Sequence, residues 1–466
     1  MENETSSIIG QFEPPTAGGS RSTKVKAATS KLVAALCSVL LLAAVGLAGC
    51  NLLAKPTLPS QEEKPTVTIV PGEATPYASP TPSRPPAISS AITLTLWTTE
   101  DFFPTEADAS GQILARQWQA FQAAHPNVTI EYILKKPHGR GGILDFLGTA
   151  RAAAPTVLPD LAILDTLELD EAAEAGLVQP LDDLVSSELQ QDLFPFARCS
   201  LGGQLMGIQF EADVEHLIYN TNKIDSPPMT WKEVISDRVA YIFPAGGEGG
   251  LVNDAFLIQY LAVGGRLFDK SGKPALDKDA LAQVLRFYAD GLEAGVIPLS
   301  VLEFEGLDDC WLAYVSAKAA MSNVSSARYL ADRELLKYTS FAAMPTRDGN
   351  TATLSKGWAL AIVTEDSGRQ AVAAQLIEWL LETENNADWN QAAGHLPTRQ
   401  AAFEHLGTAE HYFRFMRQQL ENVYPRPIAS AYEKIGPALQ RAVQDVLKGE
   451  ASPQEAAAAV ITAVEQ

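Results

Sequence analysis

The chain has 466 residues, four cysteines and a net charge of −21. This acidity argues against nucleic acid as a partner, and so few cysteines argue against a fold that depends on disulfides. The segment after residue 90 is too long for one hydrophobic core, so it predicts two lobes.

The chain begins with basic residues and an apolar run that ends in Leu47-Ala48-Gly49-Cys50. This order is typical of an export signal, although the run is also just long enough to be an uncleaved membrane anchor. The small residues before Cys50 resemble the lipobox of bacterial lipoproteins. That resemblance implies a signal peptide at 1–49 and a lipid on Cys50. Either alternative places residues 51–466 outside the cytoplasm, at the cell membrane.

Residues 50–90 are rich in Pro, Ser and Thr and predict an extended linker, because such sequence buries too little apolar area to fold. Beyond it, only Cys199 and Cys310 remain. Outside the cytoplasm they could form a disulfide, but we expect two free thiols.

The first part of the folded region alternates predicted strands and helices. Alternating β-branched and apolar residues favour strands, and apolar residues at helical spacing favour helices. This order indicates a parallel sheet with crossover helices. The expected strands are 92–97, 128–133 and 159–164, and the expected helices are 111–125, 143–153 and 169–175, the last closed by Gly176.

The remaining sequence mixes short strands with longer helices. Thr230 is a plausible N-cap for the helix that follows it. The expected strands are 204–209 and 216–220, and the expected helices are 280–291, 370–381 and 435–466, the last broken between Gly449 and Pro453.

Catalytic motifs are not apparent. The sequence contains no His-Glu-x-x-His, no Gly-x-Ser-x-Gly and no Cys-x-x-Cys, and its six histidines are scattered. Neighbouring acids such as Glu100-Asp101 could form a glycosidase pair, but they are more typical of a solvated loop. Four tryptophans near strand ends could stack on a sugar ring or simply fill the core: Trp97, Trp311, Trp358 and Trp389. We therefore expect no metal, no cofactor and no enzymatic step.

Several phrases, taken in order, resemble extracellular solute-binding proteins of family 1, the ligand-capture subunits of ABC importers. Each phrase is weak alone, but the ordered set spans nearly all of residues 91–450. The phrases are FQAAHPNVTI from Phe121, EAGLVQPLD from Glu174, LIYNTN from Leu217, TWKEV from Thr230, GGRLFDKSGKP from Gly264 and GHLP from Gly394.

The resemblance implies an α/β fold of two lobes, each a mainly parallel sheet flanked by helices, as in maltose-binding-like periplasmic proteins. Lobe 1 would hold residues 91–210 and 346–382, and lobe 2 residues 211–345 and 383–466. A hinge would close the lobes on a small solute, expected to be a sugar or oligosaccharide. The implied partners are ABC permease subunits and, through the lipid, the membrane. We expect a monomer.

The resemblance also places the ligand-binding residues at strand ends that face the other lobe. Trp358 is the expected stacking platform for a sugar. Gln209 stands where many members have proline at a lobe crossing. The other expected ligand-binding residues are Thr99, Glu100, Asp101, Asp165, Glu211, Asp213, Asn253, Asp254 and Asn323.

Two other functions stay open. An extracellular hydrolase of polysaccharides would need a positioned acid pair or nucleophile. A ligand-sensing scaffold would use the same fold without a transporter, and only a neighbouring permease would distinguish it from an importer subunit.

Overall fold

The computed structural model describes residues 91–465, except 248, 270–272, 407–409 and 425–428. The expected signal peptide, Cys50 and the linker at 50–90 lie outside the described residues. The described chain from 91 onward lies in one compact unit by its contacts. Within the described residues, no helix has the length and apolar character that a membrane span needs.

The first sheet has the strand order β2-β1-β3-β11-β5-β4. β1 pairs in parallel with β2 and β3, whereas β11 runs antiparallel to both β3 and β5. The strands are β1 (Ile92–Thr98), β2 (Val128–Leu134), β3 (Leu161–Asp165), β4 (Arg198–Leu201), β5 (Gln204–Gln209) and β11 (Trp358–Ile362).

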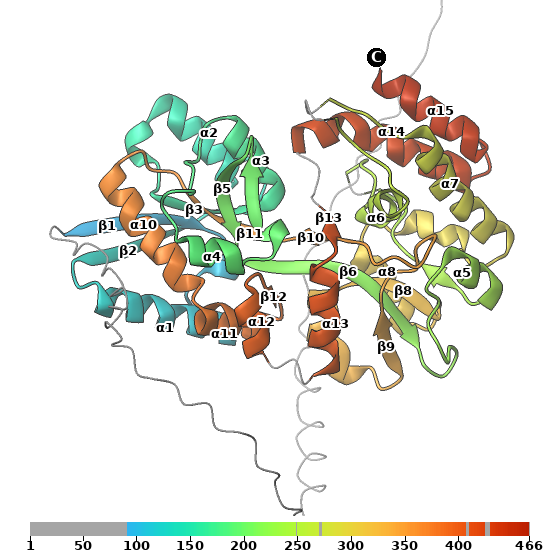
Figure 1. The fold of residues 1–466 in the computed structure, drawn as a ribbon, viewed down its shortest axis with the longest axis horizontal. Helices are drawn as coiled ribbons and strands as arrows, with labels where there is room; N and C mark the ends of the chain where they lie inside the picture. The colour runs from blue at the N-terminus through green and yellow to red at the C-terminus, as the bar shows by residue number, and fades with distance from the viewer. Residues whose placement is uncertain (1–90, 248, 270–272, 407–409, 425–428, 466) are drawn as a thin grey trace, which may run out of the picture. The chain divides into compact units, whose positions relative to one another are not determined.

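The first sheet and the helices packed against it form one half of the described chain, and these helices cover both faces of the sheet (Figure 1). One core holds Trp118, Phe121 and Ile377 from α1 and α10, and the other holds Ile143 and Leu169 from α2 and α3. The elements are η1 (Glu100–Phe102), α1 (Ala109–Ala124), α2 (Ile143–Ala153), η2 (Pro155–Val157), α3 (Thr166–Glu174), α4 (Ser187–Asp192), η3 (Pro195–Ala197) and α10 (Ser367–Leu380).

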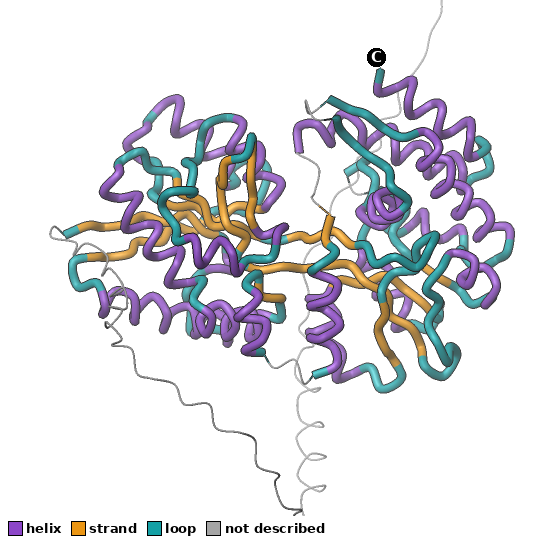
Figure 2. The backbone as a smooth tube through the Cα atoms, viewed as in Figure 1, coloured by secondary structure: helices purple, strands orange, loops and turns teal. Residues whose placement is uncertain are grey.

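The second sheet has the order β13-β10-β6-β8-β7, and β9 and β12 also pair with β6. Figure 2 shows the long strand β6 as part of the stretch of strands that links the two sheets. The strands are β6 (Glu211–Asn220), β7 (Tyr241–Ile242), β8 (Met321–Ser325), β9 (Thr339–Ala342), β10 (Thr353–Lys356), β12 (Leu396–Pro397) and β13 (Val423–Tyr424).

The helices of the second half build its largest core around Leu281, Val284 and Leu439. The helices of this half are α5 (Trp231–Asp237), α6 (Asp254–Ala262), α7 (Lys278–Glu293), η4 (Leu299–Glu303), α8 (Leu307–Val315), α9 (Ser326–Asp332), η5 (Arg333–Leu335), α12 (Gln400–His405), α13 (His411–Leu420), α14 (Ala429–Leu447) and α15 (Pro453–Val464). The remaining helix, α11 (Thr383–Ala393), lies against the first half.

The expected α/β class with two sheets is confirmed, but the sheets are mixed rather than mainly parallel. Among the described strands, six pair with β11 or β6 and run antiparallel to them: β3, β5, β8, β9, β10 and β12. Thr230 caps α5 as expected, and Gly176 has the expected left-handed backbone. Cys199 and Cys310 are free thiols.

Two segments pack differently from the expected lobe limits. β10 pairs with β6 in the second sheet, although residues 346–382 were expected in lobe 1. α11 packs against α1, and its Trp389 lies in the core with Phe121, although residues 383–466 were expected in lobe 2. Besides Trp389, α11 buries Asn386 and Asn390, whose side-chain amides donate to the Phe210 carbonyl.

Candidate functional site

The chain crosses between the sheets at two adjacent points. Phe210 alone separates β5 from β6, and Gly357 alone separates β10 from β11. The two crossings are hydrogen-bonded to each other, since the Phe210 amide donates to the Trp358 carbonyl at 2.7 Å. Both connections are therefore short and lie side by side.

Gln209 and Gly357 hold the crossings together. The Gln209 side-chain nitrogen donates to the Glu211 carbonyl at 2.8 Å and to the Ser355 hydroxyl at 3.0 Å. A Cβ at position 357 would lie 2.2 Å from that nitrogen and 2.3 Å from the Glu211 carbonyl oxygen. Only glycine fits at position 357 without displacing backbone. Gln209, which stands where many members of the family have proline, supplies the side chain that hydrogen-bonds one crossing to the other.

Glu211 is a buried carboxylate at this junction, with 1 % of its surface exposed. Its Oε1 accepts a hydrogen bond from the Trp358 amide at 2.9 Å. Its Oε2 lies 3.2 Å from Nδ1 of His395, without the alignment of a hydrogen bond. Burial raises the pKa of Glu211 to about 7, although the nearby His395 opposes the shift. A buried acid with one free oxygen can accept a donor from a ligand.

Trp358 is partly exposed and opens β11. Its ring centroid lies 5.8 Å from that of Phe102 and 5.4 Å from that of His138, the latter with a 31° interplanar angle. Nδ1 of His138 lies 3.1 Å from Oε1 of Glu168 on α3. Burial raises the pKa of Glu168, and the hydrogen bond from His138 opposes that shift. An aromatic face therefore lies beside carboxylates, an arrangement that suits a sugar ring and its hydroxyls.

Two acids and one amide near the second sheet have different roles. Oδ1 of Asp213 accepts from the Ser326 hydroxyl at 2.8 Å and from the Ala327 amide at 3.0 Å, so it is engaged by the first turn of α9. Asp254 begins α6, and its Oδ2 lies 3.8 Å from Nζ of Lys356. Asn253 precedes it and donates to the Glu305 carbonyl, while its buried Oδ1 makes no hydrogen bond to the described residues.

The expected residues from the first sheet lie at the carboxyl ends of β1 and β3. Thr99 is buried, and its hydroxyl makes no hydrogen bond to the part of the chain described. Glu100 and Asp101 are exposed in the next turn. Asp165 caps α3 through the Leu167 amide at 2.8 Å and lies opposite Trp358 in the strand pairing.

Asn323 belongs to the core of the second sheet. Its Nδ2 donates to Oε1 of Glu215 at 2.5 Å, and its Oδ1 accepts from the Tyr241 hydroxyl at 2.7 Å. With both ends of the amide engaged and 1 % of the residue exposed, we leave Asn323 out of the site.

The structure thus brings together the expected residues Asp165, Glu211 and Trp358 through strand pairing and a direct hydrogen bond. Sequence reasoning did not single out the partners that the fold adds there: His138, Glu168, Lys356 and His395. His395 belongs to the quoted phrase that begins at Gly394, and this was the one available signal. Among the described residues, no group of His, Cys, Asp and Glu is arranged to hold a metal ion.

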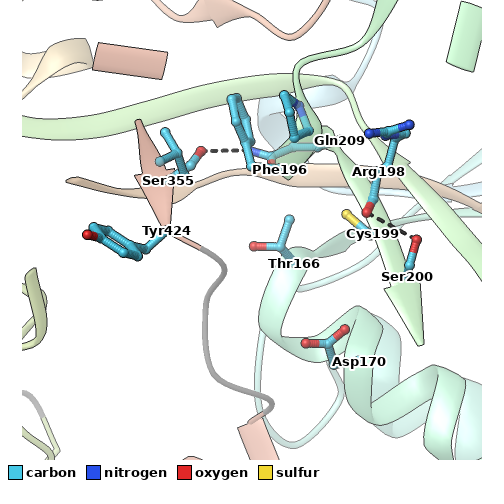
Figure 3. A pocket seen from close by; sticks show the side chains of 11 residues that line it. Thr166, Asp170, Phe196, Arg198, Cys199, Ser200, Gln209, Ser355 and Tyr424 are labelled. Atoms are coloured by element: carbon cyan, nitrogen blue, oxygen red, sulfur yellow. Dashed lines mark hydrogen bonds between the residues drawn. The ribbon is translucent and has the colours of Figure 1, made fainter. Parts of the chain in front are cut away.

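A separate pocket of about 260 Å³ lies beside the crossings. Figure 3 shows Thr166 and Asp170 on α3, and Ser355 and Tyr424 on strands of the second sheet. Pro195, Phe196, Arg198, Cys199, Ser200, Gln209 and Val423 complete its lining. None of the expected ligand-binding residues lines this pocket, so it is distinct from the surroundings of Trp358.

Comparisons with known proteins identify the family of this chain. The model of the bacterial extracellular solute-binding proteins matches residues 117–411. A maltotriose-binding protein of Pyrococcus abyssi is 30 % identical over 141 residues, which cover 29 % of this chain and 31 % of that protein. A probable ABC transporter-binding protein of Deinococcus radiodurans is 26 % identical over 285 residues, covering 54 % of this chain and 67 % of the relative.

Solved structures share the fold at low identity. The cyclic alpha-maltosyl-1,6-maltose binding protein of Arthrobacter globiformis has a TM-score of 0.68 at 19 % identity, covering 80 % of this chain and 98 % of that one. Maltose-bound MalE3 of T. maritima has a TM-score of 0.62 at 19 % identity, covering 80 % and 99 %. The family and these neighbours are binding proteins rather than enzymes. Since the family model covers more than half of the sequence, this chain belongs to the bacterial extracellular solute-binding proteins.

Proposed function

We propose that this protein captures a sugar or oligosaccharide outside the cytoplasm and delivers it to the permease subunits of an ABC importer. The observation that carries the sugar assignment is the partly exposed Trp358 ring beside Glu168, Asp165 and Glu211. The names of the relatives support this assignment, because they include binders of maltotriose and maltose. The name of the Deinococcus relative supports the importer.

In the proposed mechanism the solute lies over Trp358, with hydroxyls donating to the surrounding carboxylates. Thr99, Asp213, Asn253 and Asp254 are the further ligand-binding candidates, and Glu100 and Asp101 form an exposed rim. No bond of the solute is made or broken. Binding favours the closed arrangement only if the solute contacts both lobes better there.

The proposed hinge is the pair of crossings at Phe210 and Gly357, together with the segment from Gly394 to Thr398. That third segment is tied to the crossings, since the Thr398 hydroxyl donates to the Gln209 carbonyl at 2.6 Å. With these limits, lobe 1 comprises residues 91–209 and 358–393, and lobe 2 comprises 211–356 and 396–466. Few residues need to change their backbone angles in such a hinge.

The proposed location rests on the sequence of the leader. Lipid attachment at Cys50 anchors the protein to the membrane, and the linker at 50–90 gives the lobes reach above it. One chain supplies both lobes of the proposed site, so the proposal requires no second copy of the protein.

The test is thermal unfolding of the full chain, purified in mild detergent, with maltose, maltotriose, amino acids and polyamines. Solute that binds only the folded protein raises the unfolding midpoint, by the equivalent of about 2.7 kcal/mol at 100 times the dissociation constant. A shift specific to one sugar class, with the sugar recovered intact, supports the proposal. A shift with amino acids or polyamines alone contradicts the sugar assignment.

Trp358→Ala tests the site itself. Loss of the aromatic face should weaken sugar binding about fivefold or more, since stacking contributes about 1 kcal/mol or more. Trp379→Ala is the matched control, because Trp379 packs on Phe121 and bonds the Gln117 carbonyl. The control should lower stability without changing affinity. Equal affinity of the Trp358 variant and the wild type would rule out the stacking role.

A further inference from the structure

The loop between β2 and α2 carries His138 to the aromatic ring proposed to hold the sugar. Its base is fixed at both ends, since the Lys135 amide donates to the Thr98 carbonyl at 2.8 Å and the Ile143 amide donates to the Lys136 carbonyl at 3.2 Å. The Lys135 ammonium is held as well, because it lies over two aromatic rings of the same lobe. The loop therefore leaves the lobe from an anchored base.

The tip of this loop, residues 137–140, is held mainly by His138. Gly139 in the tip and Gly141 after it have left-handed backbone, with φ of 67° and 82°, a region that side chains other than glycine rarely enter. Within the tip, His138 alone has a hydrogen bond or ring contact with a described residue outside the loop. Segments with so few contacts open at low cost, so the tip can move while its base stays in place.

His138 makes the two contacts that a sugar is proposed to make. Its ring lies against Trp358, with centroids 5.4 Å apart and an interplanar angle of 31°, and its Nδ1 lies 3.1 Å from Oε1 of Glu168. A sugar likewise presents an apolar face to an aromatic ring and a hydroxyl to a carboxylate. The imidazole therefore occupies one stacking position and one acceptor that the solute would use.

The rings of His138 and Trp358 lie too close together to hold a sugar between them. Atoms in nonbonded contact are about 3.5–4.0 Å apart, so a sugar stacked between two rings needs a separation of about 7–8 Å. The observed separation of the centroids is 5.4 Å. A solute that stacks on this side of Trp358 must therefore displace His138.

Trp358 and Glu168 belong to a strand and a helix, so the displacement falls on His138. The Trp358 amide donates to the buried Glu211, and its ring packs against the buried Phe102. Glu168 lies in the first turn of α3, and its side chain is 18 % exposed, against 55 % for that of His138. The most exposed of these side chains is thus the one carried by the loop.

We propose that His138 is a built-in cover of the solute site: in the free protein it occupies the face of Trp358 and the acceptor of Glu168, and the solute displaces it as the loop tip moves away. The inference rests on the proposed function, because it concerns the same aromatic ring. The cover keeps an apolar face out of water in the free protein. It also lowers the apparent affinity, because the solute binds only the uncovered fraction of the protein.

The main experiment compares the maltotriose affinity of the wild-type full chain and of His138→Ala by calorimetric titration. If the cover is in place in about nine-tenths of the free protein, its removal tightens the apparent affinity about tenfold. Arg140→Ala is the matched control, because Arg140 is exposed on the same loop and has no ion pair within the described part of the chain. This control should bind maltotriose as the wild type does. Unchanged or weaker binding by His138→Ala overturns the proposal.

Hydroxyl-radical oxidation, measured by mass spectrometry of peptides, tests the cover without any solute. In the free protein, Trp358 should be oxidised faster in His138→Ala, which lacks the cover, and in Glu168→Leu, which lacks the acceptor that holds it. Arg140→Ala should match the wild type. The rates are normalised to that of Trp379, which is partly buried on α10 and donates to a carbonyl of α1. An unchanged rate for Trp358 in both variants overturns the proposal.

The same oxidation with saturating maltotriose distinguishes a cover from a second wall of the site. A displaced cover predicts that His138 of the wild type is oxidised faster with the sugar, while Trp358 is protected. Protection of both residues would place His138 on the bound solute and would overturn the proposal. If no variant binds any member of the sugar panel, the proposed function fails, and the oxidation of Trp358 in the free protein still decides whether His138 covers it.

Discussion

The buried Glu211 predicts an unusual dependence of stability on pH. Burial raises its pKa from the ordinary 4.5 to about 7, so the folded protein holds this proton more tightly than the unfolded chain. Its contribution to stability is therefore full below about pH 4.5 and is lost as the pH rises toward and past 7. The shift corresponds to about 3 kcal/mol at 1.36 kcal/mol per pKa unit.

Glu211→Gln removes the ionisation and leaves an oxygen that can accept from the Trp358 amide. The free energy of unfolding of this variant, relative to wild type, should therefore rise by about 2–3 kcal/mol between pH 5 and pH 8. Urea titrations at the two pH values measure the change. Glu215 and Asp170, whose pKa values burial also raises to about 7, are common to both proteins and cancel in the comparison.

Glu100→Gln is the matched control, because Glu100 is exposed. Its effect should be the same at both pH values. If Glu211→Gln gave an equally constant difference, or lost relative stability as the pH rose, the reasoning from burial would be refuted.

Three further changes separate structure from binding. Gly357→Ala places a Cβ 2.2 Å from the Gln209 nitrogen and should lower the free energy of unfolding by about 1–3 kcal/mol, measured by thermal unfolding. Gly148→Ala is the control: open space surrounds that position, so this variant should be as stable as the wild type or more stable. Asn323→Ala leaves its two buried partners unpaired and should lower the urea midpoint, at a cost on the order of 2–4 kcal/mol, without changing sugar affinity; a loss of affinity alone would return Asn323 to the site. Cys50→Ser should abolish labelling by a radioactive fatty acid, and retained label would refute the lipobox interpretation.

The first half of the fold was predictable because its signals are local. The helix at 143–153 and the strand at 204–209 have the expected bounds, since apolar periodicity and flanking turns determine them. β6 was harder. It begins at Glu211, five residues before the expected start, because buried acids break the apolar pattern. Their burial depends on partners such as His395 and Asn323 that are distant in sequence.

The candidate site was only partly predictable from the sequence, for the same reason. Asp165 and Trp358 were predictable as residues at strand ends. His138 and His395 were not, because they come from loops whose positions depend on the complete fold. The packing of α11 on the first sheet likewise depends on a contact with α1, which periodicity within α11 does not encode.

The most direct test of the central claim is a calorimetric titration of the full chain with maltotriose, followed by analysis of the sugar. We predict saturable binding of one sugar per chain, recovery of intact maltotriose, and weaker binding by Trp358→Ala. Cleavage of the sugar, or no binding of any member of the sugar panel, would contradict the account.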